Sequence, residues 1–198
     1  MLFRSVLITP AITGECNVSL EMFIMRTEFL KKIVQEAASK SQHSLVRDVL
    51  QGRKDEFVIK GYEHKGVFTK IDGLAAYYQA NLSLLQADTR AGLFQESAPI
   101  YTKVGDNAPV KYGLESSVKN SLIADGCVIE GSVENCVLFR GVRIGKDAVV
   151  KNSVLMQGTH VGEKCNIERV IADKNVDISS DKVLTGSDDF PRDRKSVV

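Results

Sequence analysis

Aliphatic, small and turn-forming residues recur at a short, nearly fixed period through the last third of the chain. One seven-residue phrase consists of an Asn, a small residue, two aliphatic residues, two variable residues and a Gly. Its copies occupy residues 120–126, 135–141 and 152–158, and a degenerate fourth copy occupies residues 168–174. The spacing between the starts of successive copies is therefore nearly constant. Repetition at such a period predicts a solenoid.

Hexads within these repeats indicate the cross-section of the solenoid. Each begins with an aliphatic residue and contains a small or turn-forming residue, as in 123–128, 144–149 and 161–166. Roughly six residues per face and about three faces per turn are typical of a parallel β-helix with a triangular section. Aliphatic side chains would stack inside it, and Gly and Asn would take the corners, where a positive φ costs them little. We therefore predict a parallel β-helix over 118–186, followed by a tail over 187–198, in preference to an antiparallel domain with Gly-rich hairpins.

The first 95 residues show a mixed pattern of helices and strands. Apolar residues at helical spacing predict helices over 27–39, 43–50, 72–85 and 88–95. Thr27 and Asp72 stand where the caps of the first and third of these helices are expected. Strand patterns cover 17–25, 56–62 and 66–71. The elements indicate an α/β domain over 1–95, joined to the solenoid by a linker over 96–117 that contains Pro and Gly.

An opening strand with no element before it makes a poor complete domain. We therefore expect residues 1–95 to be the C-terminal part of a larger α/β domain, and Met1 to mark a truncated start. Such a part would expose apolar surface that the rest of the domain should cover.

Charge and cysteine content limit the expected partners and the expected cellular compartment. The chain has 26 Lys and Arg against 25 Asp and Glu and no basic block, so nucleic acid is not an expected partner. No apolar run approaches the roughly 18 residues of a membrane span, so no membrane is expected either. The four cysteines lack CxxC spacing, and Cys127, Cys136 and Cys165 fall within the repeats, where we expect small buried hydrophobes. These features favour a reducing cytoplasm.

Five segments carry a resemblance to the sugar-nucleotide pyrophosphorylases, and among them to bacterial ADP-glucose pyrophosphorylase (glucose-1-phosphate adenylyltransferase). They are 17–25, 43–50, 66–85, 99–113 and 120–145. The resemblance implies an α/β nucleotidyltransferase domain, here a remnant, followed by a left-handed parallel β-helix built from hexapeptide repeats. It covers nearly the whole chain from Asn17 to about Ile178.

The sequence departs from the family pattern where the family carries its chemistry. Residues 19–23 resemble a Ser-Met-Gly-Ile-Tyr segment but place Glu21 at the Gly, and residues 43–48 lack the first Asp and the Gly of a His-Asp-Phe-Gly-Lys-Asp segment. Residues 67–73 resemble Tyr-Trp-Arg-Asp-Val-Gly-Thr, with Lys70 at the Asp that helps to hold Mg²⁺ in the family. An ammonium cannot ligate that ion. Asp72 lies two residues on and is better explained as a helix cap.

These departures resemble the D-type subunit of bacterial glycogen synthesis, which is similar to the catalytic C-type subunit but has a degraded active site. The resemblance implies no catalytic residue, no metal ligand and no cofactor in this chain, with Mg²⁺ held by the catalytic partner. It implies vestigial substrate contacts at Ser19, Phe23, Asp48 and Phe68. Its implied role is to assemble with the C-type subunit in a hetero-oligomer, a tetramer, and to regulate the formation of ADP-glucose from ATP and glucose 1-phosphate.

Basic residues on one predicted coil are candidates for effector binding. Arg140, Arg143, Lys146 and the nearby Lys151 gather positive charge there, and phosphorylated sugars are the usual effectors of the family the chain resembles. A solvated charged face is the alternative explanation.

Two other functions remain open at this point. Hexapeptide-repeat acyltransferases use CoA and a His between coils as a general base, and His160 stands at a predicted corner. The β-helix could also be a purely structural oligomerisation module, because its open end and flat faces suit packing against other subunits.

Overall fold

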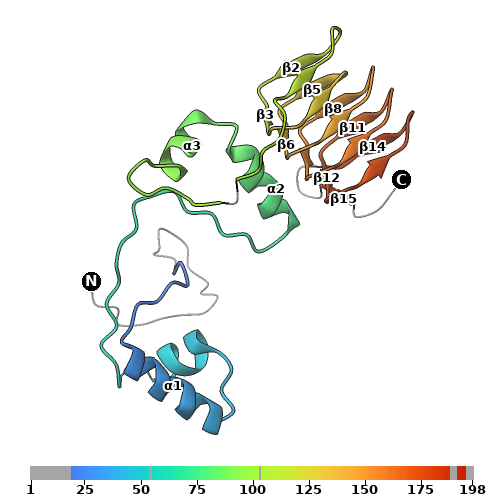
Figure 1. Cartoon of the computed structure of the whole chain (residues 1–198). Helices are drawn as coiled ribbons and strands as arrows, with labels where there is room; N and C mark the ends of the chain where they lie inside the picture. The colour runs from blue at the N-terminus through green and yellow to red at the C-terminus, as the bar shows by residue number, and fades with distance from the viewer. Residues whose placement is uncertain (1–18, 54, 103, 188–190, 195–198) are drawn as a thin grey trace. The chain divides into compact units, whose positions relative to one another are not determined.

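The computed structural model describes residues 19–53, 55–102, 104–187 and 191–194. The chain forms two compact units, Met1–Lys65 and Gly66–Val198 (Figure 1). The helices near 72–95 therefore belong to the same unit as the solenoid. Among the residues described, none of the helices combines the length and the apolar character that crossing a membrane requires.

The solenoid of the second unit consists, in its described part, of fifteen short strands in three parallel sheets. The first sheet holds β1 (Lys111–Tyr112), β4 (Val128–Ile129), β7 (Arg143–Ile144), β10 (His160–Val161) and β13 (Asp177–Ile178). The second holds β2 (Ser117–Lys119), β5 (Ser132–Glu134), β8 (Val149–Lys151), β11 (Asn166–Glu168) and β14 (Val183–Thr185). The third holds β3 (Leu122–Ile123), β6 (Val137–Leu138), β9 (Val154–Leu155), β12 (Val170–Ala172) and β15 (Arg192–Arg194). Neighbours in each sheet lie three strands apart in the chain, which confirms the predicted hexapeptide-repeat β-helix.

Left-handed backbone conformations mark the corners of the coils. Three rows have positive φ: Asn120, Asn135, Asn152 and Arg169; Gly126, Gly141, Gly158 and Asn175; and Asp147, Lys164 and Asp181. Gly and Asn reach this region at little cost, which explains why the repeated phrase begins with Asn and ends with Gly. Asn side chains also bond between coils, since Asn120 Nδ2 donates to Asn135 Oδ1 at 2.8 Å.

The register corrects the alignment of the degenerate fourth copy. Val154 on β9 pairs with Ile171 on β12, so Arg169 and not Glu168 occupies the place of Asn152. The predicted start of this copy at Glu168 was therefore wrong by one position. Arg169 takes the left-handed conformation with φ 53°, so the Asn that marks this corner elsewhere is absent from the sequence.

Stacked side chains fill the interior of the coils. One inward residue per strand aligns with its equivalents above and below, as Ile144 and Val161 do on the first sheet. The core is completed at the corners by small residues, among them Ala148, Cys127, Cys136 and Cys165, all buried. The prediction that the three repeat cysteines are buried hydrophobes is confirmed. Burial raises the pKa of the Cys136 thiol to about 12 and also raises that of Cys127, so both thiols stay protonated at neutral pH.

Helix α2 (Leu74–Ser83) covers the outer face of the third sheet. That face presents an apolar row of Val137, Val154 and Ile171, against which Tyr78 packs with 1% of its surface exposed. The Tyr78 hydroxyl donates to the carbonyl oxygen of Asn152 at 2.5 Å. A sheet with aliphatic residues on both faces must be covered on its outer side, and α2 provides this cover.

Two helix caps differ from the sequence prediction. The N-cap of α2 is Gly73, without a side-chain cap bond, so Asp72 is not the cap. The N-cap of α1 (Thr27–Ser39) is Arg26, and Thr27 is the first helical residue. Helix α3 (Ala87–Leu93) follows α2, and the predicted helices at 27–39, 72–85 and 88–95 are confirmed apart from their ends.

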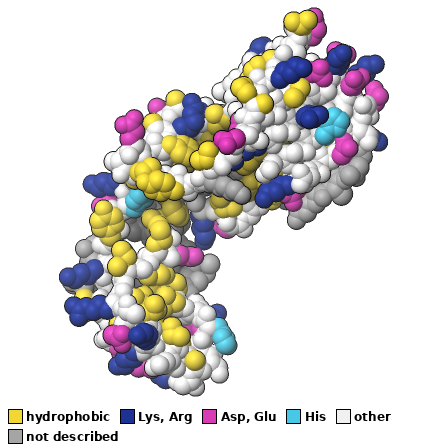
Figure 2. Space-filling view, viewed as in Figure 1, with side chains coloured by type: hydrophobic (Ala, Val, Ile, Leu, Met, Phe, Trp, Pro, Cys, Tyr) yellow, Lys and Arg dark blue, Asp and Glu magenta, His cyan; other side chains and the backbone are white. Residues whose placement is uncertain are grey.

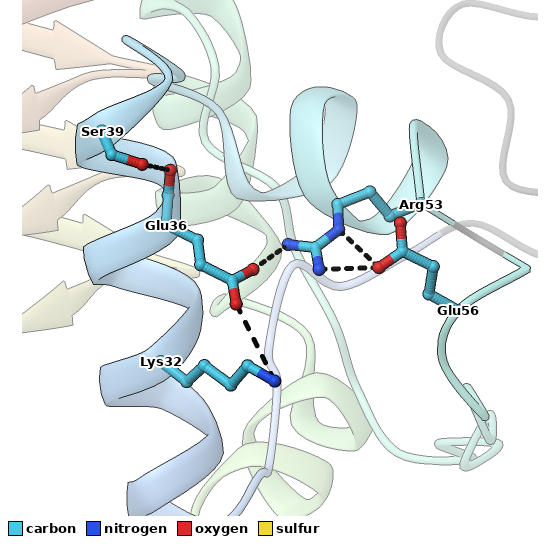
Figure 3. Close-up of polar contacts among 5 residues, drawn as sticks. All are labelled: Lys32, Glu36, Ser39, Arg53 and Glu56. Carbon is cyan, nitrogen blue, oxygen red and sulfur yellow. Dashed lines mark hydrogen bonds and ion pairs between the residues drawn. The ribbon is translucent and has the colours of Figure 1, made fainter.

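The first unit holds α1 and a π-helical segment η1 (Leu45–Gln51), close to the helix predicted at 43–50. Arg53 ties them together (Figure 3): its Nη1 donates to Glu36 Oε2 at 2.7 Å and its Nη2 to Glu56 Oε2 at 2.7 Å. The guanidinium carbon lies 4.8 Å from the centroid of the Phe57 ring, which meets Phe29 edge to face. Arg53 thus bridges α1 and the segment after η1.

The three predicted strands of the first 95 residues are absent from the residues that the structure describes there; residues 17 and 18 lie outside them. Many apolar side chains of these segments remain exposed, with Ile24, Val58 and Tyr62 exposing 104%, 78% and 92% of their surface, whereas Phe57 and Ile59 are half-buried. Figure 2 shows hydrophobic side chains gathered on the part that carries α1. A strand requires neighbouring strands for its backbone N–H and C=O groups, and these segments find none among the described residues.

Candidate functional site

Ser19 and Phe23, two candidate vestigial substrate contacts, lie in an irregular segment of the first unit. Ser19 Oγ accepts a hydrogen bond from the backbone N–H of Glu21 at 3.1 Å, and Phe23 is 40% exposed. Glu21 has φ 58°, in the left-handed region. That conformation suits a Gly, whereas a side chain there is strained. The segment therefore keeps a backbone conformation suited to Gly but carries Glu21, with its added carboxylate.

Asp48, the third candidate, bonds to the start of η1. Its Oδ2 accepts from the backbone N–H groups of His43 and Ser44 at 3.0 and 2.9 Å, and its Oδ1 accepts from Arg47 Nε at 3.0 Å. Ser44 Oγ accepts in turn from the Arg47 N–H, so the two side chains cap the segment reciprocally. The backbone bond from Ser44 lowers the pKa of Asp48, with further contributions from Arg47 and His43. Both carboxylate oxygens are engaged in local structure.

Phe68, the fourth candidate, belongs to the second unit, in the irregular stretch before α2. It is 44% exposed, and Lys70 and Asp72 beside it are exposed as well. Over the described stretches of the chain, no three His, Cys, Asp or Glu side chains come together in a way that could hold a metal ion. The structure thus places Ser19, Phe23 and Asp48 in one unit and Phe68 in the other.

The candidate effector-binding residues follow one coil around the solenoid. Arg140 precedes the corner at Gly141, Arg143 lies on the outer face of the first sheet, and Lys146 lies at the next corner. Lys151 is on the second sheet, 3.6 Å from Glu134. The four basic residues share a coil but do not converge on one face.

Arg140 is held by an acidic neighbour. Its Nε donates to Asp125 Oδ1 at 3.1 Å, while Asn107 Nδ2 donates to Asp125 Oδ2 at 2.7 Å. The bond from Asn107 lowers the pKa of Asp125, and Arg140 adds to this. The N–H of Gly126 bonds to the carbonyl oxygen of Ala108, so this cluster fastens the segment before β1 to the first coil. The sequence did not predict this role of Asp125, because Asp125 and its partner Asn107 are far apart in the chain.

His160, the candidate general base of the acyltransferase alternative, lies on β10 and not at a corner. Its Nδ1 lies 3.0 Å from Asp177 Oδ1 on the adjacent strand β13, and half of the imidazole is exposed. A carboxylate can orient an imidazole in this way, but the pair faces outward from the first sheet.

A row of charged side chains on the second sheet was also missed. It consists of Lys119, Glu134, Lys151 and Glu168, which pair in register on β2, β5, β8 and β11. Each member precedes a corner residue of the repeated phrase, Asn120, Asn135, Asn152 or Arg169. This position in the repeat is a signal that the sequence alone could have provided. We call these four residues the charge row.

Comparisons with known proteins agree with this architecture. Residues 108–197 match the family model described as GlmU-like, C-terminal hexapeptide. The glycogen biosynthesis protein GlgD of Bacillus subtilis (strain 168) is 40% identical over 173 residues, which cover 87% of this chain and 50% of that protein. GlgD of Geobacillus stearothermophilus is 43% identical over 132 residues, which cover 67% of this chain and 38% of that protein. This chain is a homologue of GlgD.

Glucose-1-phosphate adenylyltransferases form a second group of relatives. The protein from Geobacillus stearothermophilus is 38% identical over 140 residues, which cover 67% of this chain and 35% of that enzyme. The resemblance to the ADP-glucose pyrophosphorylases, and among them to the D-type subunit, is therefore confirmed. The matched model describes a C-terminal hexapeptide region, which fits the expectation that this chain corresponds to the C-terminal portion of such a protein. The chain spans about half the length, or less, of these relatives.

Proposed function

We propose that this chain acts in glycogen biosynthesis as a regulatory and assembly part of a glucose-1-phosphate adenylyltransferase, without carrying the catalysis itself. It would support the formation of ADP-glucose from ATP and glucose 1-phosphate by a catalytic partner. The observation that carries the proposal is the similarity to GlgD over 87% of the chain. Lys70, which the family resemblance aligns with a metal-binding Asp, is consistent with it.

The chemistry of nucleotidyl transfer supports a non-catalytic role. The reaction needs Mg²⁺ to neutralise the phosphates and align them, and oxygen ligands to hold that ion. Lys70 brings a positive charge to this position, Glu21 adds a carboxylate where the family has Gly, and Asp48 is engaged at η1. We infer that Mg²⁺ and the catalytic residues belong to the partner, and that this chain needs no cofactor.

The proposed partner is the catalytic C-type subunit, in a hetero-oligomer with the size of a tetramer. Such an assembly would work in the cytoplasm, without nucleic acid or membrane. The β-helix is suited to assembly because it is rigid and presents flat sheet faces.

A reconstitution experiment tests this function. ADP-glucose formation would be measured for the full-length protein, for the C-type subunit and for their mixture, with size-exclusion chromatography of each sample. We expect no measurable synthesis by the full-length protein alone, co-elution in the mixture, and a changed rate or effector response of the partner. Synthesis by this protein alone at a rate comparable to the C-type subunit would contradict the proposal.

Arg140, Arg143 and Lys146 are proposed effector contacts within this role. Binding of fructose 1,6-bisphosphate, at fixed salt and pH, would be compared between the unaltered protein, Arg140→Ala and Arg143→Ala. Asp125 already compensates the charge of Arg140, so we expect Arg143→Ala to weaken binding more. Equal affinity in all three proteins would remove both arginines from consideration.

A further inference from the structure

The charge row alternates strictly in sign along the solenoid. Lys119, Glu134, Lys151 and Glu168 occupy equivalent positions on four successive strands of the second sheet, labelled β2, β5, β8 and β11 in Figure 1. Their side chains point outward, and those of Lys151, Glu134 and Glu168 expose 48%, 42% and 35% of their surface. Adjacent rungs lie about 4.8 Å apart, the distance between neighbouring strands.

A four-member row of alternating sign is complementary to its own reversed copy. If a second copy faces this sheet with its solenoid axis reversed, Lys119 meets Glu168 of the second copy and Glu134 meets its Lys151. All four contacts across the interface then join opposite charges, at the same spacing in both copies. A two-fold axis between β5 and β8, parallel to the strands, produces this arrangement.

The surface beside the charge row permits close approach. The neighbouring outward row holds the small or medium side chains Ser117, Ser132, Val149 and Asn166. With the charge row it borders a shallow depression of about 250 Å³ over β2, β5 and β8. Small side chains on a flat sheet allow two such faces to meet without a protruding obstacle.

The other two faces of the solenoid lack this property. On the first sheet, the outward row is Lys111, Val128, Arg143, His160 and Asp177. Neither stretch of four successive rungs in this row pairs opposite charges when it is reversed, because Lys111 meets His160 in one stretch and Arg143 meets His160 in the other. The third sheet is covered by α2. Self-complementarity is thus confined to the second sheet.

We propose that the second sheet is a docking surface for a second copy of this chain, packed face to face with the solenoid axes antiparallel. The contact area is small, because strands of three residues span only about 10 Å. Stable interfaces bury roughly 800 Å² per partner. The dimer is therefore weak and forms at high protein concentration. Because exposed charges contribute to it, salt weakens it. This inference does not rest on the proposed function, since it concerns the isolated chain.

Cross-strand pairing within one chain is the competing explanation of the row. Lys151 Nζ lies 3.6 Å from Glu134 Oε2 of the same chain, and Glu168 bonds to Arg169. Pairing within the chain explains why like charges do not stack, but it predicts no association between copies. A test must therefore separate contacts within one chain from contacts between two.

Complementary charge reversals distinguish contacts within one chain from contacts between two chains. Lys151→Glu places Glu against Glu twice across the antiparallel dimer, and Glu134→Lys places Lys against Lys twice. An equimolar mixture of the two variants restores opposite charges at all four contacts, although each chain keeps its own unfavourable row. Thr185→Lys is the matched control, because Thr185 on β14 lies beyond the four overlapping rungs.

Sedimentation velocity over a concentration series, at low and high ionic strength, provides the measurement. We expect the unaltered chain and Thr185→Lys to dimerise at low salt, each single reversal to weaken dimerisation at least tenfold, and the mixture to recover it. Thermal melts confirm that each variant is folded. A monomeric unaltered chain throughout the series, or a mixture that fails to recover, would overturn the proposal and leave the row to pairing within the chain or to a different partner.

Discussion

The β-helix and the first unit use their apolar residues in opposite ways. In the β-helix, aliphatic residues such as Ile144, Leu155 and Ile167 are fully buried against equivalents one coil away. In the described part of the first unit, the buried hydrophobic residues are Ile33, Val49 and Leu50, while apolar residues of the segments predicted as strands lie exposed.

The difference shows how far each architecture depends on distant partners. A coil of the β-helix finds its neighbours one repeat away in the chain, as Val133 does at Val118 and Val150, so each repeat supplies the surface that the next one covers. An α/β layer instead needs strands from elsewhere in the sequence before its apolar faces are covered. The same hydrophobic content thus produces a filled core in one unit and exposed side chains in the other.

Truncating one aliphatic residue in each region should give the largest difference in stability between the variants. Leu155→Ala removes a buried side chain from the third sheet and should lower the free energy of unfolding of the β-helix by about 2–5 kcal/mol. Ile24→Ala, at a fully exposed position of the first unit, should change stability by less than about 0.5 kcal/mol. Denaturant unfolding followed by circular dichroism measures both. Similar losses in the two variants would show that Ile24 is packed in solution.

Adding a methyl group tests how tightly successive coils approach. A Cβ at Gly131 would lie 2.7 Å from the carbonyl oxygen of Gly145 and closer still to that of Ala148, so Gly131→Ala should cost about 1–3 kcal/mol. Gly105→Ala, whose Cβ would come no closer than 3.4 Å to the side chains of Arg140 and Asn107, is the matched control and should be nearly neutral. Thermal melts of the two variants provide the comparison. A neutral Gly131→Ala would mean that the coils can separate at no cost.

Removing one hydroxyl tests how α2 is held on the third sheet. Tyr78→Phe deletes the hydrogen bond to the carbonyl oxygen of Asn152 and should cost about 1 kcal/mol. Tyr62→Phe, at an exposed position of the first unit, should leave stability unchanged within error. Hydrogen exchange of the α2 amides checks the effect, since it should rise in Tyr78→Phe alone. Unchanged exchange would assign the contact to apolar packing.

The smallest expected effect is a titration. The folded-state pKa of Asp48 lies below its ordinary value of 3.8, chiefly through the Ser44 N–H. Its contribution to stability is therefore present above about pH 4 and is lost as pH falls through the folded-state pKa. The pKa of Asp125 in the β-helix is also lowered, chiefly by the hydrogen bond from Asn107. Carboxyl NMR titration should give both midpoints below 3.8. A midpoint at the ordinary value for Asp48 would show that its bonds at η1 do not persist.

The sequence predicted the elements whose stabilising contacts are close in the chain. The bounds of α1 agree with the apolar spacing of 27–39, and the phrase beginning at Asn120 located the first three copies of the coil. The prediction of the fourth copy was wrong by one residue because Arg169 adopts a backbone conformation that its residue type does not announce. The strands predicted at 56–62 and 66–71 were wrong for the described residues, because apolar alternation favours a strand only in a context that supplies pairing strands.

The contacts of the candidate site residues were harder to predict from the sequence than the helices and coils. Ser19, Phe23, Asp48 and Phe68 were chosen through the family resemblance, and no contact among the described residues tests their role. The engagement of Asp48 at η1 and the clamp of Asp125 on Arg140 appear only in the structure, because side-chain partners are set by folded geometry. The charge row could have been found from its place in the repeat.

The sequence by itself determined the β-helix, the corners marked by Asn and Gly, and the buried cysteines, because a short period fixes which residue stacks on which. It also motivates the proposal that this chain carries no metal ligand, because Lys70 stands where the family that the chain resembles has an Asp. Only the tertiary structure decided that α2 covers the third sheet and that Arg169 forms the fourth corner, which aligns Glu168 with Lys151. Both features depend on contacts between segments that the local pattern of apolar positions does not specify: the packing of a helix on a sheet, and the pairing of one coil with the next.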